Sequence, residues 1–151
     1  MSYCCHAVAI KTLIRLCHEI SWGFVSKKIL VCDDSKVMRS LLIRIMREKF
    51  SNAIGHCVEA SHGKQGFQCF MSEALDLILL DWKMPEIDGL TLIKMIRASP
   101  SANNRVPIVM ITAEKSTGHI REAVKAGANQ FIAKPFTPDS IFKSLEPFIC
   151  K

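Results

Sequence analysis

The sequence lacks any stretch of about 18–20 uncharged apolar residues, the length that a membrane-spanning helix requires. Residues 1–26 carry Lys11, Arg15 and Glu19 and have no basic start, so they do not fit a secretory signal peptide. Internal repeats and low-complexity tracts are also absent from the sequence. We therefore expect a cytoplasmic protein that has no membrane span.

Cysteine pairs and zinc-binding spacings are missing as well. The seven cysteines are odd in number and none belongs to a C-x-x-C motif, which indicates reduced thiols in a cytosol. Cys4, Cys5 and His6 lie together, but their spacing matches no zinc site. Cys32 and Cys57 lie inside apolar runs, where a thiol usually serves as a small core residue.

The composition is that of a folded domain. Hydrophobic residues make up 49% and charged residues 23% of the 151 residues, which excludes wholesale disorder and suggests one domain. The net charge of +6 is only mildly basic and does not by itself indicate nucleic-acid binding. DNA recognition would also need a reading helix in a domain of its own, so we expect no nucleic-acid partner.

Short apolar runs alternate with segments of helical periodicity. The runs are rich in Val, Ile and Leu, as is typical of strands buried on both faces. The expected strands are Ile29–Cys32, Cys57–Ala60, Leu77–Leu80, Val106–Ile111 and Phe131–Ala133. The expected helices are Val37–Met46, Gly63–Met71, Gly89–Ala98, His119–Ala126 and Ser140–Phe148. Gly127 fits a helix C-cap, and Thr137 followed by Pro138 fits a helix start.

This alternation predicts an α/β domain over residues 27–149, a five-stranded doubly wound parallel sheet with five helices. Pro107 would have to lie at the start of its strand, where a missing N–H is tolerable. Residues 1–26 stand outside the pattern. Their apolar residues follow helical spacing, so they form either an amphipathic docking helix or a poorly ordered extension upstream of the true start codon.

Polar residues follow the expected strands at their carboxyl ends, where open parallel sheets bind ligands. Asp33 and Asp34 follow the first run and Asp81 follows the third. Thr112 and Lys134 follow the fourth and fifth runs. Three neighbouring carboxylates cannot all stay ionised without cations, and Lys134 supplies only one positive charge. The oxygen ligands predict a Mg²⁺ site, with Mn²⁺ as an alternative.

Such a site suits phosphoryl chemistry. A carboxylate can attack phosphorus to form an acyl phosphate, and a cation, an ammonium and a hydroxyl can hold the phosphoryl oxygens. A single Asp after a strand is usually only a helix N-cap. Three Asp, one Thr and one Lys after four of the five expected strands favour a functional site.

The motifs CDDS at 32–35, LLDWKMPEIDG at 79–89, ITA at 111–113 and FIAKPF at 131–136 resemble the receiver domain of bacterial two-component response regulators. They are most similar to the single-domain chemotaxis regulators of that family, and the resemblance covers about Lys27–Ile149. It implies the flavodoxin-like (CheY-like) strand order 2-1-3-4-5.

The resemblance also implies the roles of the acidic residues. Asp81 would be the phospho-acceptor and would bind the metal directly together with Asp34. Asp33 would bind it through water, and the backbone carbonyl of Lys83 would complete the protein ligands.

Three further residues would couple phosphorylation to a response. By the resemblance, Thr112 is the switch hydroxyl, Lys134 contacts the phosphoryl group, and Phe131 is the switch aromatic residue. Because Phe131 has no hydroxyl to form a hydrogen bond, packing alone would stabilise the conformation in which its ring turns into the domain. Lys134–Pro135 would be a cis peptide.

These expectations describe a stand-alone receiver, phosphorylated by a histidine kinase, that switches a protein-binding face. They describe a phospho-acceptor signalling protein rather than an enzyme with turnover. The fourth helix, fifth strand and fifth helix would form the face toward the downstream target. The candidate contacts on this face are Ile120, Val124, Phe131, Ala133 and Lys143.

Three alternatives remain. The receiver could instead be a phosphorelay shuttle that passes phosphate to a histidine phosphotransfer protein. The chain could also be an aspartate-nucleophile phosphatase. Many of these enzymes carry a second Asp two residues after the nucleophile, and Lys83 at that position argues against this alternative. A flavin-binding module would need a neutral loop in place of Asp33 and Asp34.

Lys83 and Glu114 are expected to flank the path of the water that hydrolyses an acyl phosphate on Asp81. The chemotaxis regulators carry a short amide where this chain has Lys83. An ion pair between Lys83 and Glu114 would form a lid that lengthens the lifetime of the phosphate. Alternatively, Lys83 points into solvent and only its carbonyl matters.

Overall fold

The computed structural model describes residues 26–114 and 116–150, in which strands and helices alternate five times. The strands are β1 (Lys27–Cys32), β2 (Ile54–Ala60), β3 (Leu77–Leu80), β4 (Ile108–Thr112) and β5 (Gln130–Ala133). The helices are α2 (Lys36–Phe50), α3 (Gly63–Ser72), α4 (Gly89–Ala98), α5 (Thr117–Ala126) and α6 (Pro138–Ile149). The expected extension over residues 1–26 falls almost wholly outside the described residues.

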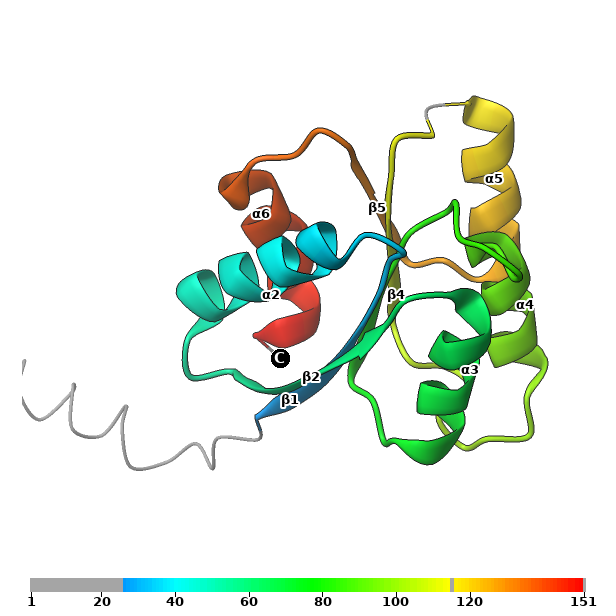
Figure 1. Ribbon diagram of the computed structural model, residues 1–151, viewed down its shortest axis with the longest axis horizontal. Helices are drawn as coiled ribbons and strands as arrows, with labels where there is room; N and C mark the ends of the chain where they lie inside the picture. Colours follow the sequence, from blue (N-terminus) through cyan, green and yellow to red (C-terminus); the bar gives the residue numbers. More distant parts are fainter. Residues whose placement is uncertain (1–25, 115, 151) are drawn as a thin grey trace, which may run out of the picture.

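The five strands form one parallel sheet in the order β2-β1-β3-β4-β5. Helices α2 and α6 cover one face of the sheet, and α3, α4 and α5 cover the other (Figure 1). The predicted doubly wound α/β fold and its strand order are therefore confirmed. Because parallel strands begin and end at common edges, the loops after β1, β3, β4 and β5 meet at one edge of the sheet.

Two apolar clusters, one on each face, hold the layers together. Successive residues of a strand point to opposite faces, so Leu30 packs toward α3–α5 while Ile29 and Val31 pack toward α2 and α6. All residues of β3 and β4 are buried, as expected for the centre of a sheet covered on both sides. Each fully buried Leu, Ile or Val stabilises the fold by about 1.5–3 kcal/mol.

Helix termini follow the local sequence signals. Gly127 has a φ of 110° and its N–H donates to the carbonyls of Ala123 and Val124, so it terminates α5 in the left-handed conformation that favours glycine. Thr137 and Ser140 form a reciprocal capping box at the start of α6, with Pro138 at its first position. Both predicted caps are confirmed.

The fourth strand starts later than the sequence pattern predicts. It begins at Ile108, so Val106 and Pro107 lie before it rather than in it. The N–H of Val106 closes a turn on the carbonyl of Asn103, and Pro107 has no N–H with which to join the ladder. Only the Pro107 carbonyl takes part, accepting a bond from the Ile78 N–H at 2.9 Å. Within the described residues, none of the helices has both the length and the apolar character that crossing a bilayer requires.

Candidate metal and phosphoryl site

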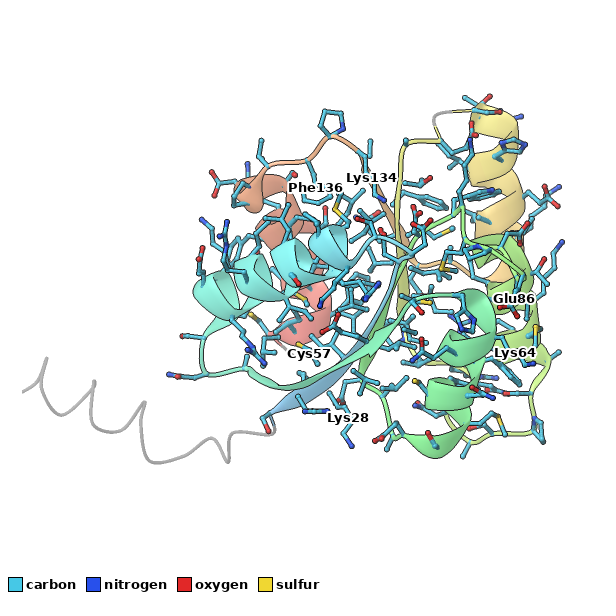
Figure 2. The ribbon with its side chains drawn as sticks, viewed as in Figure 1. Lys28, Cys57, Lys64, Glu86, Lys134 and Phe136 are labelled. Atoms are coloured by element: carbon cyan, nitrogen blue, oxygen red, sulfur yellow. The ribbon has the colours of Figure 1, made fainter. Side chains whose placement is uncertain are left out.

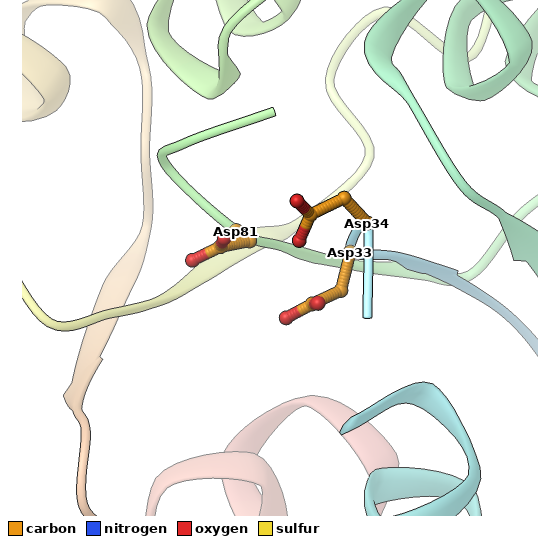
Figure 3. Close-up of side chains that lie close together, drawn as sticks. All are labelled: Asp33, Asp34 and Asp81. Carbon is orange, nitrogen blue, oxygen red and sulfur yellow. The ribbon is translucent and has the colours of Figure 1, made fainter. Parts of the chain in front are cut away.

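Three carboxylates meet at the carboxyl edge of the sheet. Asp33 and Asp34 follow β1 and Asp81 follows β3, and one carboxylate oxygen from each lies within 4.8 Å of the others (Figure 3). Among the described residues, this is the one such group of three potential metal ligands. The structure thus brings together the three acidic side chains that the sequence analysis selected.

Main-chain pairing fixes this convergence. Cys32 lies opposite Leu80 in the β1–β3 register, so the residues that follow them leave the sheet side by side. The N–H of Asp81 donates to the Cys32 carbonyl at 2.9 Å, and the N–H of Asp33 donates to the Ala60 carbonyl at 3.1 Å. Both aspartates therefore start from backbone positions that the sheet holds in place.

Lys134 lies in the loop after β5 (Figure 2). Its side chain bridges two of the carboxylates. Its Nζ donates to Asp33 Oδ2 at 2.9 Å and to Asp81 Oδ1 at 3.1 Å. Its own N–H donates to the Thr112 carbonyl at 2.8 Å, and the Lys134–Pro135 peptide is cis, as expected. The ammonium supplies one compensating charge to the acidic cluster.

Burial and ion pairing act in opposite directions on the pKa values of Asp81 and Lys134. The exposed side-chain fractions are 3% for Asp33, 10% for Asp81 and 19% for Lys134. Burial raises the pKa of Asp81 above its ordinary value, with Asp33 adding to the rise, while the charge and hydrogen bond of Lys134 oppose it. Burial alone would lower the pKa of Lys134, but its bonds to Asp33 and Asp81 raise that pKa above its ordinary value.

The donor set fits a hard divalent cation. Three ionised carboxylates and one ammonium leave a net charge of −2, which one divalent cation would neutralise, and oxygen donors favour Mg²⁺. Asp34 is exposed and Asp81 uses one oxygen for Lys134. Both oxygens of Asp33 already accept hydrogen bonds, from Lys134 and from the Ser35 N–H at 2.8 Å. Asp33 is thus the least available for direct ligation, in line with the water-mediated role that the resemblance implies.

Thr112 and Phe131 lie on the neighbouring strands. Thr112 ends β4 and is buried, and its Oγ1 accepts a hydrogen bond from the Glu114 N–H at 3.0 Å. Phe131 lies in β5, where it is half-buried and packs against the apolar cluster beneath α3–α5. Thr112 and Phe131 therefore lie on the two strands that continue the sheet from β3 to its β5 edge.

Glu114 interacts with a residue that the sequence analysis did not select. Its Oε2 lies 3.4 Å from His119 Nδ1, and its Oε1 accepts from the Ser116 N–H at 2.9 Å. The His119 ring packs on the Trp82 ring with 5.4 Å between centroids. The Ser116 bond lowers the pKa of Glu114, and His119 and Lys83 lower it further.

Among the described residues, the ion pairs of the structure do not include one between Lys83 and Glu114, and the exposed side chain of Lys83 agrees with the alternative expectation that it points into solvent. The Glu114 carboxylate instead lies next to His119, in the first turn of α5, with 3.4 Å between Oε2 and Nδ1. Lys83 is exposed and lines an open cleft, which has a volume of about 660 Å³. The cleft lies beside Asp81 and is lined by Asp34, Trp82, Lys83, Met84, Pro85, Asp88, Glu114 and His119.

The expected partner face lies at the β5 edge of the sheet, between α5 on one face and α6 on the other (Figure 1). Val124 is 54% exposed, Ala133 and Lys143 are exposed, and Ile120 and Phe131 are half-buried.

Comparison with known proteins gives one consistent result. Residues 29–146 match the family model for the response regulator receiver domain. The chain is 40% identical over 122 residues to the chemotaxis protein CheY1 of Helicobacter pylori, an alignment that covers 79% of this chain and 94% of that protein. It is 38% identical to a CheY homologue of Campylobacter jejuni, covering 79% of this chain and 89% of the relative.

Solved structures show the same relationship. The receiver domain of the sensor histidine kinase PA1611 of Pseudomonas aeruginosa, which holds a magnesium ion in its active-site cleft, superposes with a TM-score of 0.72 at 26% identity. That match covers 84% of this chain and all of the other. The chemotaxis regulator CheY4 of Vibrio cholerae gives a TM-score of 0.73 at 27% identity, covering 82% and 99% of the two chains.

Proposed function

This chain belongs to the family of response regulator receiver domains, and we propose that it is a CheY-type switch that a histidine kinase phosphorylates on Asp81 in a Mg²⁺-dependent reaction. The observation that carries the proposal is the cluster of three carboxylates within 4.8 Å, two of which Lys134 bridges. This arrangement combines a nucleophile, cation ligands and a fixed positive charge at one strand edge.

In the proposed reaction, a carboxylate oxygen of Asp81 attacks the phosphorus of a phosphohistidine. The new bond is O–P, the bond that breaks is P–N, and the imidazole leaves with the electron pair and takes up a proton. Asp34 and Asp81 would hold Mg²⁺, with Asp33 acting through water and Lys83 through its carbonyl, and the bound ion would neutralise charge that develops on the phosphoryl oxygens. Lys134 lies at hydrogen-bond distance from the acceptor carboxylate and would follow the phosphoryl group.

The response to phosphorylation would pass through Thr112 and Phe131. The Thr112 hydroxyl bonds to the Glu114 N–H, and turning it toward a phosphoryl oxygen would break that bond. The space it leaves lies next to β5, where Phe131 could pack further inward. The face that includes Ile120, Val124, Ala133 and Lys143 would then change its affinity for a downstream protein.

Phosphotransfer profiling tests this function. Wild type and Asp81→Asn are incubated with a panel of labelled histidine kinases, and label on wild type alone supports the proposal. Subsequent transfer of the label to a histidine phosphotransfer protein would favour the relay role, whereas phosphorylation-dependent binding to a target would favour the chemotaxis type. Label on neither protein from any kinase would contradict the proposal.

Mg²⁺ is expected to change the fluorescence of Trp82 in the unphosphorylated protein. Trp82 follows Asp81 directly and is buried beside the cleft, so a cation at Asp81 alters its surroundings. Because the chain has two tryptophans, the titration uses Trp22→Phe, which leaves Trp82 as the reporter. If millimolar Mg²⁺ changes neither this emission nor the NMR shifts around Asp34, the metal site is wrongly assigned.

The residues around the cleft are expected to set the lifetime of the acyl phosphate. Since Glu114 contacts His119 and Lys83 lines the same cleft, Lys83→Asn and His119→Ala should each open the path of the attacking water. We expect phosphate loss to accelerate about two- to tenfold, because about 1.4 kcal/mol in a barrier changes a rate tenfold. Glu122→Ala, which removes an exposed ion pair between α5 and Lys94 of α4, is the control. Equal decay of all four proteins at fixed Mg²⁺ would contradict the expectation.

A further inference from the structure

The side chain of Arg39 turns back from α2 onto the loop that carries both metal-site aspartates. Its Nη1 donates to the Asp33 carbonyl at 2.8 Å and lies 3.4 Å from the Asp34 carbonyl. Its Nε donates to Glu59 Oε2 at 2.9 Å. One guanidinium thus ties the loop after β1 to a residue near the end of β2.

This placement is electrostatically unusual for a cation. The N-terminus of a helix carries partial positive charge, which disfavours a basic group there, and the first turn of α2 has no acidic residue. The Arg39 side chain is nevertheless only 11% exposed. Glu59 and the nearby acidic cluster compensate the charge, so a specific set of partners keeps the guanidinium in place.

We propose that Arg39 is a positioning residue for the divalent-cation site, holding the main-chain carbonyls of Asp33 and Asp34 so that their carboxylates point toward Asp81. This inference rests on the proposed function. Because Arg39 bonds to main-chain oxygens, it orients the aspartates without occupying the carboxylate oxygens that a cation would use. The planar guanidinium reaches the loop and Glu59 at once, which a lysine cannot do.

Two effects of removing Arg39 have opposite signs. Loss of a positive charge near the carboxylates would tighten Mg²⁺ binding, whereas loss of the loop contact would weaken it. Glu59 lies 2.9 Å from the guanidinium and already neutralises much of its charge. The loss of order in the loop after β1 should therefore determine the net change in Mg²⁺ affinity. Outer contacts that orient metal ligands typically change metal affinity about 10–100-fold.

The test is a Mg²⁺ titration of full-length Trp22→Phe protein and of the same protein carrying Arg39→Ala, Arg39→Lys or Arg44→Ala. We expect the Mg²⁺ dissociation constant to rise about tenfold for Arg39→Ala and less for Arg39→Lys. It should stay unchanged for Arg44→Ala, whose exposed side chain pairs with Glu48 on the same helix. At saturating Mg²⁺, Arg39→Ala should be phosphorylated by acetyl phosphate at the wild-type rate, since a positioning residue changes the metal requirement only.

Glu59→Ala provides a second variant, which keeps Arg39 and removes the acceptor of its Nε hydrogen bond. It should weaken Mg²⁺ binding in the wild-type background and have no further effect in Arg39→Ala, whereas a purely Coulombic effect would persist in both. If parent protein binds Mg²⁺ and Arg39→Ala binds it equally or more tightly, the positioning role is wrong even though the proposed function stands. If parent protein shows no Mg²⁺ response, the proposed function fails and the positioning role fails with it.

Discussion

Asp81→Asn is expected to abolish labelling of the protein by acetyl phosphate and Mg²⁺. An amide oxygen is a poor nucleophile toward phosphorus. Asp33 is also buried and contacts Lys134, but both of its carboxylate oxygens already accept hydrogen bonds, from Lys134 and from the Ser35 N–H. Asp139→Asn is the matched control. Asp139 is exposed, pairs with Lys49 of α2 at 2.8 Å and lies outside the group of three carboxylates, so this variant should be labelled as wild type.

The same substitution should stabilise the protein when no Mg²⁺ is present. Burial raises the pKa of Asp81, which means that the folded state disfavours its ionised form. Such a carboxyl binds protons more tightly in the folded than in the unfolded state, so its contribution to stability falls as pH rises from the ordinary to the raised pKa. Above that window the neutral amide of the Asp81→Asn variant would avoid this cost. Urea unfolding of wild type and Asp81→Asn at pH 7 measures the difference in stability. In the labelling experiment, label that persists on Asp81→Asn would show that another residue is the acceptor.

The strand ends explain why so much of the site could be predicted. A parallel sheet places the residue after each strand at one edge, so a run ending in Asp33 and another ending in Asp81 determine a cluster without any knowledge of side-chain packing. The caps at Gly127 and Thr137 were predictable for a similar reason, since each depends on residues within one turn. The strand order could be taken only from the resemblance, because apolar runs do not state which strands are neighbours.

The contacts of His119 and Arg39 could not be predicted from sequence patterns. Each meets its partner through a side-chain direction set by tertiary packing: His119 lies over Trp82 across the cleft, and Arg39 reaches Glu59 from another element. Helical periodicity only places both residues on polar faces. The missed start of β4 is a milder case, in which the Asn103–Val106 turn shortened an otherwise clear apolar run.

Lys134→Gln is expected to lower the free energy of unfolding by about 2 kcal/mol or more at pH 7 without Mg²⁺. The substitution leaves Asp33 and Asp81 buried without their ammonium partner, and breaking a buried pair from one side typically costs about 3–5 kcal/mol. The partial exposure of Lys134 places the expected loss toward the lower end. Lys125→Gln, at an exposed position on α5, should change stability by no more than a few tenths of a kcal/mol.

Mg²⁺ should restore most of the stability that Lys134→Gln loses. A ligand that binds only the folded state adds about 2.7 kcal/mol at 100 times its dissociation constant, and in this variant no ammonium competes for the carboxylate oxygens. Low pH should act in the same direction. Without Lys134 the pKa of Asp81 rises further, so protonation relieves the unpaired charge as pH falls through that pKa. Urea unfolding at pH 7 and pH 5, each with and without Mg²⁺, separates these contributions. Equal stability of wild type and Lys134→Gln at pH 7 without the ion would show that Lys134 does not neutralise the acidic cluster.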